Sequence, residues 1–385
     1  MSERVRIAAY LNIAHTYARE IRLGMGRCEK VEGSVVVQGR PFNELGKPGL
    51  GRKLRKMGIQ VVVAEVSNRR TLGRLRRMTL PVVNISERLE PRLPSVLPDQ
   101  DSVGALAAEH LMEKGLDALA FVGQPGFAFA QARWAGFAGR ARTEGIEPAC
   151  WGVGMRDRPE EWEDWHKGRP DWLASLPSPS GLLAADDELA RLVLQELDSL
   201  DRDVPNDVAV LGVNNDELAC ELASPTLTSI DLDAGRVGHE AAALAERLAR
   251  GVSPPAQPVR IPPLGVISRG STESLAISDP HVRLALEYIR SHAESPLTVD
   301  EVVQHVSISR RSLEIRFRRI MGRTLHAEIQ RTHVQKARQL LAQTDLPVTK
   351  VAEACGFSRL KQLTETFTRH EGVSPRDYRK QFRSE

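Results

Sequence analysis

Residues 298–309 read TVDEVVQHVSIS and residues 347–358 read PVTKVAEACGFS, and each stretch predicts a short amphipathic helix followed by a tight turn. In both, apolar side chains recur at helical spacing and form one stripe. They are Val299, Val302, Val303 and Val306 in the first stretch and Val348, Val351, Ala352 and Cys355 in the second. Gly356 occupies a turn position that needs a positive φ angle. The C-terminal part of the chain therefore holds two copies of a helix–turn–helix pattern.

A longer helix is predicted after each turn, at residues 310–320 and 359–369, and Ser309 can cap the first of them. Leucine and phenylalanine one turn apart must face inward in both helices. The outer faces then carry polar side chains, namely Arg310, Arg311, Glu314 and Arg318 in the first and Arg359, Lys361, Gln362 and Glu365 in the second. Arginine and glutamine suit base edges in the major groove, and lysine suits phosphates.

An ordinary helical bundle with a solvated basic face is the alternative interpretation, and the repetition of the pattern disfavours it. The two copies resemble the DNA-binding domain of the AraC/XylS family of transcription activators. The resemblance rests on Ala352, Gly356, Phe357, Phe367, Gly372, Ser374, Pro375, Tyr378 and Arg379. It implies double-stranded operator DNA and RNA polymerase as partners. We expect base contacts from Arg310, Arg311 and Arg359 and phosphate contacts from Arg318, Lys361 and Arg379, with Glu314 and Gln362 completing the candidate DNA-binding set.

Charge is unevenly distributed along the 385 residues. Residues 279–385 hold 19 Lys and Arg against 13 Asp and Glu, a net charge of +6, whereas the net charge of the whole chain is +3. The rest of the chain is therefore mildly acidic, with a net of −3. A small basic domain beside a larger acidic one fits nucleic-acid binding confined to the C-terminal part.

Several classes of site and location are disfavoured by the sequence. The four cysteines are scattered without metal-ligand spacing, so we expect reduced structural thiols, no metal and no cofactor. No apolar run is long enough to span a membrane, and the first apolar run is too short for the core of a signal peptide. The sequence therefore predicts a cytoplasmic protein without a membrane partner.

Short apolar runs alternate with amphipathic segments over residues 5–270. The predicted strands are residues 7–11, 34–37, 61–63, 81–85, 118–123, 181–185 and 208–213. The predicted helices include residues 17–27, 102–114, 131–144, 187–197 and 233–250. Such alternation predicts a parallel α/β fold, and the length of this part favours two lobes.

Polar residues follow several of these strands. Asn12 and His15 follow the first, Asp186 follows the strand at residues 181–185, and Asn214 follows the one at residues 208–213. Ligands of open parallel sheets bind at the carboxyl ends of the strands, so these residues predict a binding crevice for a polar small molecule. The alternative for any one of them is a plain helix N-cap.

This part of the chain resembles the periplasmic-binding-protein-like sensor of the LacI/GalR type. The resemblance rests on residues 181–190, 208–217, 224–230 and 131–137, and on Asp101 with Ser102 before an alanine-rich helix. It implies that Asp101, Arg133, Asp186 and Asn214 contact an inducer, which adds Asp101 and Arg133 to the candidate site. It also implies a homodimer.

The resulting domain organisation is a two-lobed α/β sensor at residues 1–268, a linker at residues 269–278, and an all-α domain with two helix–turn–helix units at residues 279–385. This order resembles AraC/XylS-family regulators of xylose operons, on residues 7–19 and 269–280. The resemblance implies a monosaccharide effector, with D-xylose the first candidate. A regulator of the same architecture that responds to a different sugar or small polar metabolite stays open.

Two functions other than a ligand-responsive regulator are disfavoured by the sequence. A nucleotide-binding enzyme is disfavoured, because no glycine-rich phosphate loop follows a strand and Gly24 and Gly26 lie inside a predicted helix. No protease or hydrolase motif is present either, so we expect no catalytic residues. A constitutive architectural DNA-binding protein would not need the large polar-lined sensor.

Overall fold

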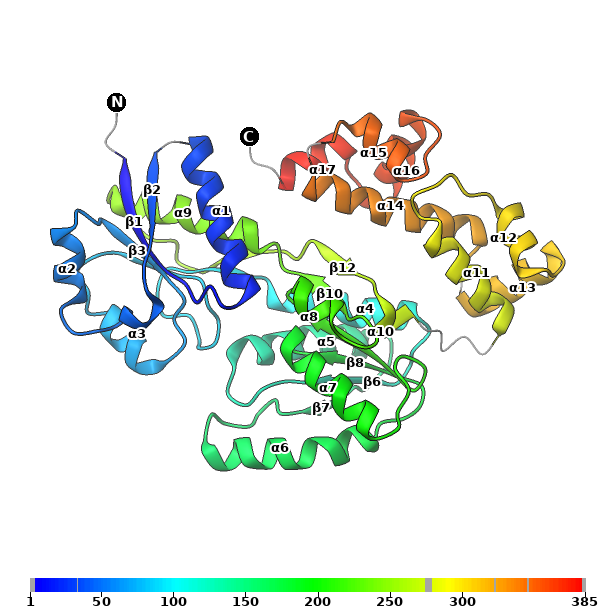
Figure 1. Ribbon diagram of the computed structural model, residues 1–385, viewed down its shortest axis with the longest axis horizontal. Helices are drawn as coiled ribbons and strands as arrows, with labels where there is room; N and C mark the ends of the chain where they lie inside the picture. The colour runs from blue at the N-terminus through cyan, green and yellow to red at the C-terminus, as the bar shows by residue number, and fades with distance from the viewer. Residues whose placement is uncertain (1–3, 33, 274–278, 322, 345, 383–385) are drawn as a thin grey trace. The chain divides into compact units, whose positions relative to one another are not determined.

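The computed structural model of the chain describes all residues except 1–3, 33, 274–278, 322, 345 and 383–385 (Figure 1). It divides into two compact units. The first unit comprises Met1–Met112 and Asp117–Thr272, and the second comprises Glu113–Leu116 and Glu273–Glu385.

The N-terminal lobe of the first unit is built on a parallel sheet with the strand order β2-β1-β3-β4. Its strands are β1 (Val5–Tyr10), β2 (Val35–Gly39), β3 (Val61–Ala64) and β4 (Val82–Asn84). The surrounding helices are α1 (Thr16–Glu32), the short η1 (Phe42–Glu44), α2 (Leu50–Lys56) and α3 (Arg69–Leu75). The strands are almost continuously apolar because helices cover both faces of the sheet.

The central lobe holds a second sheet with the order β12-β10-β9-β8-β6-β7, parallel except for the edge strand β12. Its strands are β6 (Leu119–Val122), β7 (Ala149–Trp151), β8 (Ser180–Ala184), β9 (Val208–Val213), β10 (Thr228–Asp231) and β12 (Gly265–Ile267). Its helices are α4 (Gln100–Glu113), α5 (Ala128–Thr143), α6 (Pro159–Ala174), α7 (Asp187–Ser199), α8 (Glu217–Glu221) and α10 (Gly270–Glu273).

The chain passes more than once between the two lobes of this unit. After β10 it enters α9 (Ala234–Ala249), which packs into the core of the N-terminal lobe against β1 and α1. It then returns through β11 (Val259–Ile261), which pairs with β5 (Val96–Pro98). The two-lobed α/β architecture predicted from the sequence is confirmed.

Glycine allows α1 and α9 to pack very closely. A Cβ atom added at Gly24 in α1 would lie 1.8 Å from the carbonyl oxygen of Gly235 in α9. Gly24 therefore serves helix packing, which agrees with the absence of a phosphate-binding loop at this position.

The second unit is entirely helical. Its helices are α11 (Pro280–Ser291), α12 (Val299–Val306), α13 (Arg310–Met321), α14 (Leu325–Gln343), α15 (Val348–Ala354), α16 (Leu360–Glu371) and α17 (Pro375–Phe382). Two apolar cores lie along α14. Leu325 and Ile329 belong to the first core, and Val334, Ala337 and Leu341 belong to the second. One long helix thus contributes to the apolar cores of both helix–turn–helix units.

The predicted boundary between sensor and linker needs a correction. Residues 270–273 form α10, in which Ser271 and Thr272 are fully buried. The Ser271 hydroxyl accepts a hydrogen bond from Thr228 N at 2.8 Å and donates one to the carbonyl of Val210 at 2.6 Å. Packing of the first unit therefore continues to Thr272 rather than ending at residue 268. Residues 274–278 of the predicted linker lie outside the described residues.

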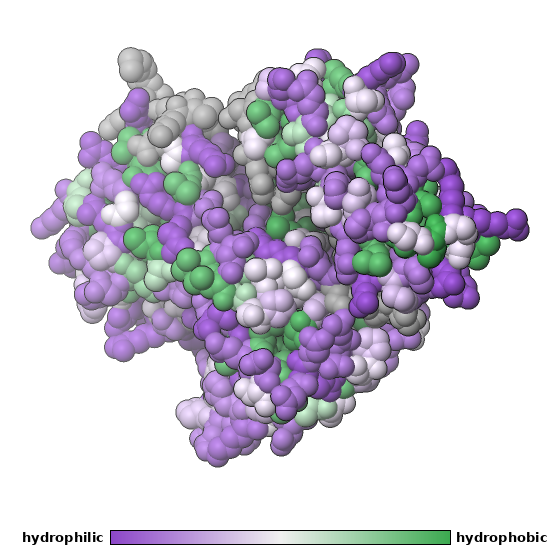
Figure 2. Space-filling view, turned by 45° about the vertical axis from the view of Figure 1, so that its right-hand side comes forward, coloured by the Kyte–Doolittle hydropathy of each residue, from purple (hydrophilic) through white to green (hydrophobic). Residues whose placement is uncertain are grey.

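Among the described residues, no helix combines the length and the apolar character that a bilayer crossing requires. The face seen in Figure 2 is largely hydrophilic, with apolar residues in scattered small groups. The large exposed apolar side chains are likewise spread over many elements.

Because α1 packs closely on α9, replacing Gly24 or Gly26 of α1 by alanine should change the stability of the protein in opposite directions. Gly24→Ala should destabilise the protein by at least about 2 kcal/mol, because the new methyl group would clash with backbone. Gly26→Ala is the matched control: its Cβ would meet only the end of the flexible Arg22 side chain, 3.7 Å away, and should stabilise α1 by up to about 1 kcal/mol. Urea unfolding of both variants checks this, and equal stabilities would contradict the packing argument.

Candidate functional site

Asp186 lies at the carboxyl end of β8 and makes two kinds of contact. Its Oδ1 accepts a hydrogen bond from Leu189 N at 2.8 Å, which caps α7. Its Oδ2 accepts one from Gln124 Nε2 at 2.7 Å. Gln124 Oε1 is buried and has no hydrogen-bond partner among the described residues. Asp186 therefore caps α7 and also pairs with Gln124. In that pair, Gln124 Oε1 is a hydrogen-bond acceptor without a partner among the described residues.

Arg133 reaches the same strand end from α5. Its side chain is buried, its Nε donates to Gln100 Oε1 at 2.6 Å, and its Nη1 donates to the carbonyl of Ala185. Burial lowers the pKa of Arg133 to about 10, and the carboxylate of Asp186 opposes that shift. A buried cation thus lies close to Asp186.

Two phenylalanine rings at the start of α5 each lie against an arginine side chain. The guanidinium of Arg133 lies 4.9 Å from the ring centre of Phe129, and that of Arg88 lies 4.3 Å from Phe127. The two phenylalanine rings are 5.5 Å apart. Flat apolar faces beside charged and amide groups are what a sugar-binding surface requires, since sugars present both C–H faces and hydroxyl groups.

The N-terminal lobe contributes Asn12 and a neighbouring carboxylate. Asn12 N donates to Glu65 Oε2 at 3.1 Å, and burial raises the pKa of Glu65. The hydroxyl of Tyr17, at the start of α1, donates to the carbonyl of Ile85 at 3.4 Å. Burial also raises the pKa of Tyr17, so its hydroxyl stays protonated and can donate.

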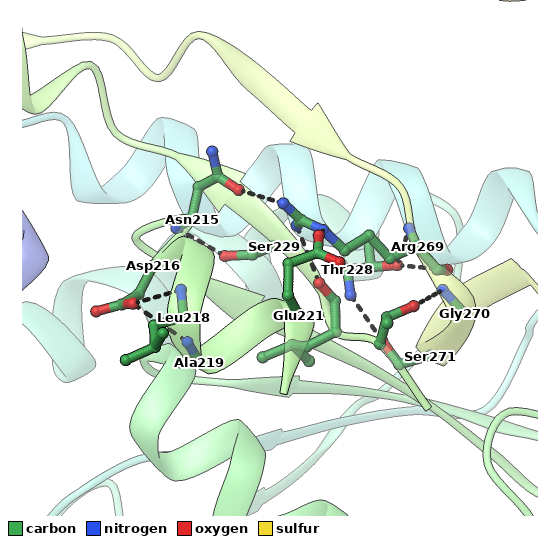
Figure 3. A network of polar contacts seen from close by, with 12 residues as sticks. Asn215, Asp216, Leu218, Ala219, Glu221, Thr228, Ser229, Arg269, Gly270 and Ser271 are labelled. Carbon is green, nitrogen blue, oxygen red and sulfur yellow. Dashed lines mark hydrogen bonds and ion pairs between the residues drawn. The ribbon is translucent and has the colours of Figure 1, made fainter. Parts of the chain in front are cut away.

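Asn214 and Asn215 follow β9 with φ angles of 118° and 50°. Asn214 N donates to the carbonyl of Ile230 at 3.0 Å, and no hydrogen bond involves its half-buried side chain among the described residues. Asn215 instead joins the polar network of Figure 3, where its Oδ1 accepts from Arg269 Nη2 at 3.0 Å. The Asn214 side chain is thus free to bind a ligand at this strand end.

The predicted site residues do not all take part equally. Asp101 is exposed on the first turn of α4, whereas its neighbour Gln100 is buried and contacts Arg133. His15 is exposed in the turn before α1. Gln100, Gln124 and Glu65 were missed because glutamine and glutamate are common in solvated segments, and only their hydrogen bonds to Arg133, Asp186 and Asn12 identify them.

Asp187, the residue after Asp186, was also missed and is fully buried. Its Oδ1 accepts from the Ser229 hydroxyl at 2.6 Å and its Oδ2 from Asp216 N at 2.8 Å. Burial raises its pKa to about 7, and these two hydrogen bonds oppose the shift. Asp187 thus fixes the loop after β9 that carries Asn214.

The candidate DNA-binding faces are built by the two helix–turn–helix units. A capping box between Thr298 and Glu301 starts α12, and Ser307 turns the chain with a φ angle of 59°. Ser309 accepts a hydrogen bond from Ser312 N at 3.3 Å, as predicted for the cap of α13. In the second helix–turn–helix motif, Gly356 has the predicted positive φ angle, 72°. A Cβ atom added to Gly356 would lie 2.4 Å from the carbonyl oxygen of Ser295.

Burial separates the inner and outer faces of α13 and α16 as predicted. Leu313 and Phe317 are buried in α13, and Leu363 and Phe367 are buried in α16. All eight residues predicted for the outer faces are exposed: Arg310, Arg311, Glu314, Arg318, Arg359, Lys361, Gln362 and Glu365. Arg359 stands at the N-cap of α16, whose first helical residue is Leu360.

The exposed side chains differ in how far they are already engaged. Arg310 pairs with Glu314 at 2.9 Å and with Asp300 at 2.7 Å. Lys361 lies 3.8 Å from Glu365, and Gln362 Oε1 accepts from the Ser358 hydroxyl at 3.0 Å. Arg310 must give up two ion pairs before it can contact DNA.

Three other arginines complete the predicted set. Arg311, Arg318 and Arg359 are exposed and make no ion pair or side-chain hydrogen bond with another described residue. Arg379 is half-buried, and its Nη2 donates a hydrogen bond at 2.7 Å to the carbonyl of Leu346, which lies in the connection between α14 and α15. Its role in the described structure is to hold that connection, so Arg379 is the weakest of the predicted phosphate contacts.

The raised pKa of Asp187 predicts a pH dependence of stability. A carboxyl group whose pKa is higher in the folded than in the unfolded state costs folding energy as the pH rises from about 4 to about 7. Asp187→Asn should remove that cost, so the stability of the variant relative to the parent should rise by up to about 4 kcal/mol over this range and level off above it. Urea unfolding at several pH values measures the difference. A difference that does not vary with pH would contradict the assignment.

Comparison with known families divides the chain in the same way as the structure. Residues 108–272 match the model of a periplasmic binding protein-like domain. Residues 302–381 match the model of a helix-turn-helix domain.

Full-length relatives contain both parts. The chain is 31% identical to the xylose operon regulatory protein of Escherichia coli (strain K12), over 98% of this chain and 97% of that protein. It is 28% identical to the protein of the same name in Haemophilus influenzae, over 85% of this chain and 86% of that one. A solved structure titled as the xylose-binding transcription activator xylR aligns with 98% of both chains, at a TM-score of 0.61 and 29% identity.

Proposed function

Because this chain belongs to the family of xylose operon regulatory proteins, we propose that it activates genes of sugar catabolism in response to D-xylose. It is a transcription regulator, not an enzyme, with a sugar-sensing domain followed by a DNA-binding domain. The single observation that carries this function is the match over 98% of the chain, because it includes both domains in the same order.

The polar groups of the first unit support a neutral monosaccharide as the effector. Asp186 and the unpartnered Oε1 of Gln124 offer acceptors to sugar hydroxyl groups, and Asn214 offers both a donor and an acceptor. Arg133 supplies a buried donor beside them. A different sugar or small polar metabolite is the alternative, and a calorimetric comparison of xylose with other pentoses and hexoses decides between them.

The site can be tested without breaking the fold. Asp186→Asn keeps an oxygen to cap α7 but removes the charge, and Asn214→Ala removes a side chain without a partner; each should weaken xylose binding by about 1–3 kcal/mol. Thr324→Ala, which removes the cap of α14 in the second compact unit, is the control and should leave the affinity unchanged. Calorimetric titration measures all three. Parental affinity in both site variants would remove these residues from the site.

The DNA-binding domain should place α13 and α16 in successive major grooves on one face of operator DNA. Grooves on one face recur about every 34 Å, and two equivalent units on one supporting helix suit that repeat. Arg311 and Arg359 are the foremost candidates for base contacts, since their guanidinium groups have no partner to give up. Arg318 and Lys361 are assigned to phosphates.

Base and phosphate contacts should have different signatures. Arg311→Ala should relax the preference at one operator position at a cost of about 1–3 kcal/mol. Arg318→Ala should weaken all sequences alike and lower the salt dependence of binding by about one counterion. Binding of the two variants to a library of single-base operator variants, at several salt concentrations, separates these effects. Arg283→Ala, on α11 outside both recognition helices, is the control. If neither α13 variant departs from the parent, α13 is not a recognition helix.

The assembly and its partners follow from the same family membership. We propose a homodimer formed through the sensing domain, RNA polymerase as the protein partner, and the cytoplasm as the place of action, since the protein must reach DNA. Sedimentation at micromolar concentration, with and without xylose, tests the dimer, and a monomer under both conditions would refute it.

A further inference from the structure

We propose that the outer face of the N-terminal lobe, formed by α2 and α3, binds the phosphate backbone of duplex DNA. This inference deepens the proposed function and rests on it, because it adds a second DNA contact to a protein that reads its operator with another domain. We call this surface the basic face. It consists of Arg52, Lys53, Arg55, Lys56, Arg69, Arg70, Arg76 and Arg77, all of which are exposed.

The fold gathers these eight side chains on one side of the lobe. Leu50 and Leu54 of α2 and Leu75 of α3 are buried in one shared core, which packs against strands β1, β3 and β4. Helices α1 and α9 pack into the other core of the same lobe (Figure 1). Because the apolar residues of α2 and α3 point to the sheet, their basic residues must point to solvent.

The charge of this segment is far from balanced. Residues 46–80 contain ten Lys or Arg and one acidic residue, Glu65, a net of +9 in a chain whose total is +3. Glu65 is half-buried and accepts a hydrogen bond from the backbone of Asn12, so it does not neutralise the surface. The one ion pair that the described residues give the basic face is Lys53 with Glu44, at 3.2 Å.

Most of the basic residues are therefore free to bind anions. Arg52, Lys56, Arg69, Arg70 and Arg76 make no ion pair or side-chain hydrogen bond with another described residue. Solvent-exposed surfaces of soluble domains usually intersperse both signs of charge, and large single-sign fields attract charged partners.

The composition of the basic face distinguishes among possible partners. Residues 46–80 contain no aromatic residue, so the face has no platform on which unpaired bases could stack. Met57 is the one large exposed apolar side chain there, at 38% exposure, so the face lacks the apolar anchors of a protein interface. Pairing with the same face of a second copy would oppose like charges.

The phosphate backbone of duplex DNA is the partner that suits the composition of the basic face. Six of the eight residues are arginines, whose planar guanidinium groups bind phosphate oxygens in bidentate fashion. DNA held by the second unit would present its flanking phosphates at high effective concentration to the first unit of the same chain. Contacts of this kind add affinity without sequence preference.

The test compares two quadruple variants of the full-length protein with the same change in net charge. Arg52→Gln, Lys56→Gln, Arg69→Gln and Arg70→Gln together remove half of the basic face. Arg156→Gln, Arg158→Gln, Lys167→Gln and Arg191→Gln remove four charges from the central lobe, three exposed and one half-buried, and form the control. Binding to an operator duplex with long flanks is measured over a range of salt concentrations. Xylose affinity and thermal unfolding confirm that both variants are folded.

The basic-face variant should bind at least about tenfold more weakly near 0.1 M salt, with a salt slope reduced by about three to four, while the control matches the parent. Equal behaviour of the two variants would overturn the proposal. So would unchanged DNA binding with loss of association with RNA polymerase, which would make the face a protein-docking surface. If the parent itself fails to bind operator DNA, the proposed function fails first, and the two failures can be told apart.

Discussion

The buried carboxylate of Asp187 holds the end of the first unit together. It accepts hydrogen bonds from the Ser229 hydroxyl, in strand β10, and from Asp216 N, in the loop after β9. The Ser229 oxygen in turn accepts from Asn215 N at 2.9 Å, and Asn215 accepts from Arg269. Asp187 is thus linked through Ser229 and Asn215 to Arg269, which precedes α10, and Figure 3 shows the part of this network that runs from Ser229 through Asn215 to Arg269.

This network joins the two places that a ligand-responsive regulator must connect. Asn214 and Asp186, the candidate sugar contacts, are each adjacent in sequence to a member of the network. Arg269 lies at its other end and also pairs with Glu221 at 2.9 Å, immediately before the helix that leads out of the first unit. A sugar that changes the backbone conformation at Asn214 would also move Asn215 and, through its hydrogen bond, Arg269, which precedes α10. In a dimer such a change would alter the spacing or freedom of the two DNA-binding domains.

The sequence predicted best those features that depend on local periodicity. The inward Leu313 and Phe317, the cap at Ser309 and the left-handed turn at Gly356 follow from neighbours within one or two helical turns. It was less successful where long-range burial decides. The family resemblance predicts Asp101 as a ligand contact, whereas the structure buries its neighbour Gln100 beside Arg133 and leaves Asp101 exposed. Asp187 gave no signal beyond that of an ordinary first-turn acid, and the carbonyl that Arg379 holds lies 33 residues away along the chain. The packed part of the first unit extends four residues beyond the predicted start of the linker. Ser271 and Thr272 are small and polar, as linker residues usually are, but they are buried and hydrogen-bonded to Thr228 of β10.

Under the proposed function, xylose bound in the first unit changes how the second unit binds DNA. Such a coupling is reciprocal, so it appears with equal size from both sides. The direct measurement is the affinity of the full-length protein for operator DNA with and without xylose, set against its affinity for xylose with and without operator DNA. We expect each ligand to tighten the binding of the other by the same factor, between about 5 and 150. Operator affinity that does not respond to saturating xylose would contradict it.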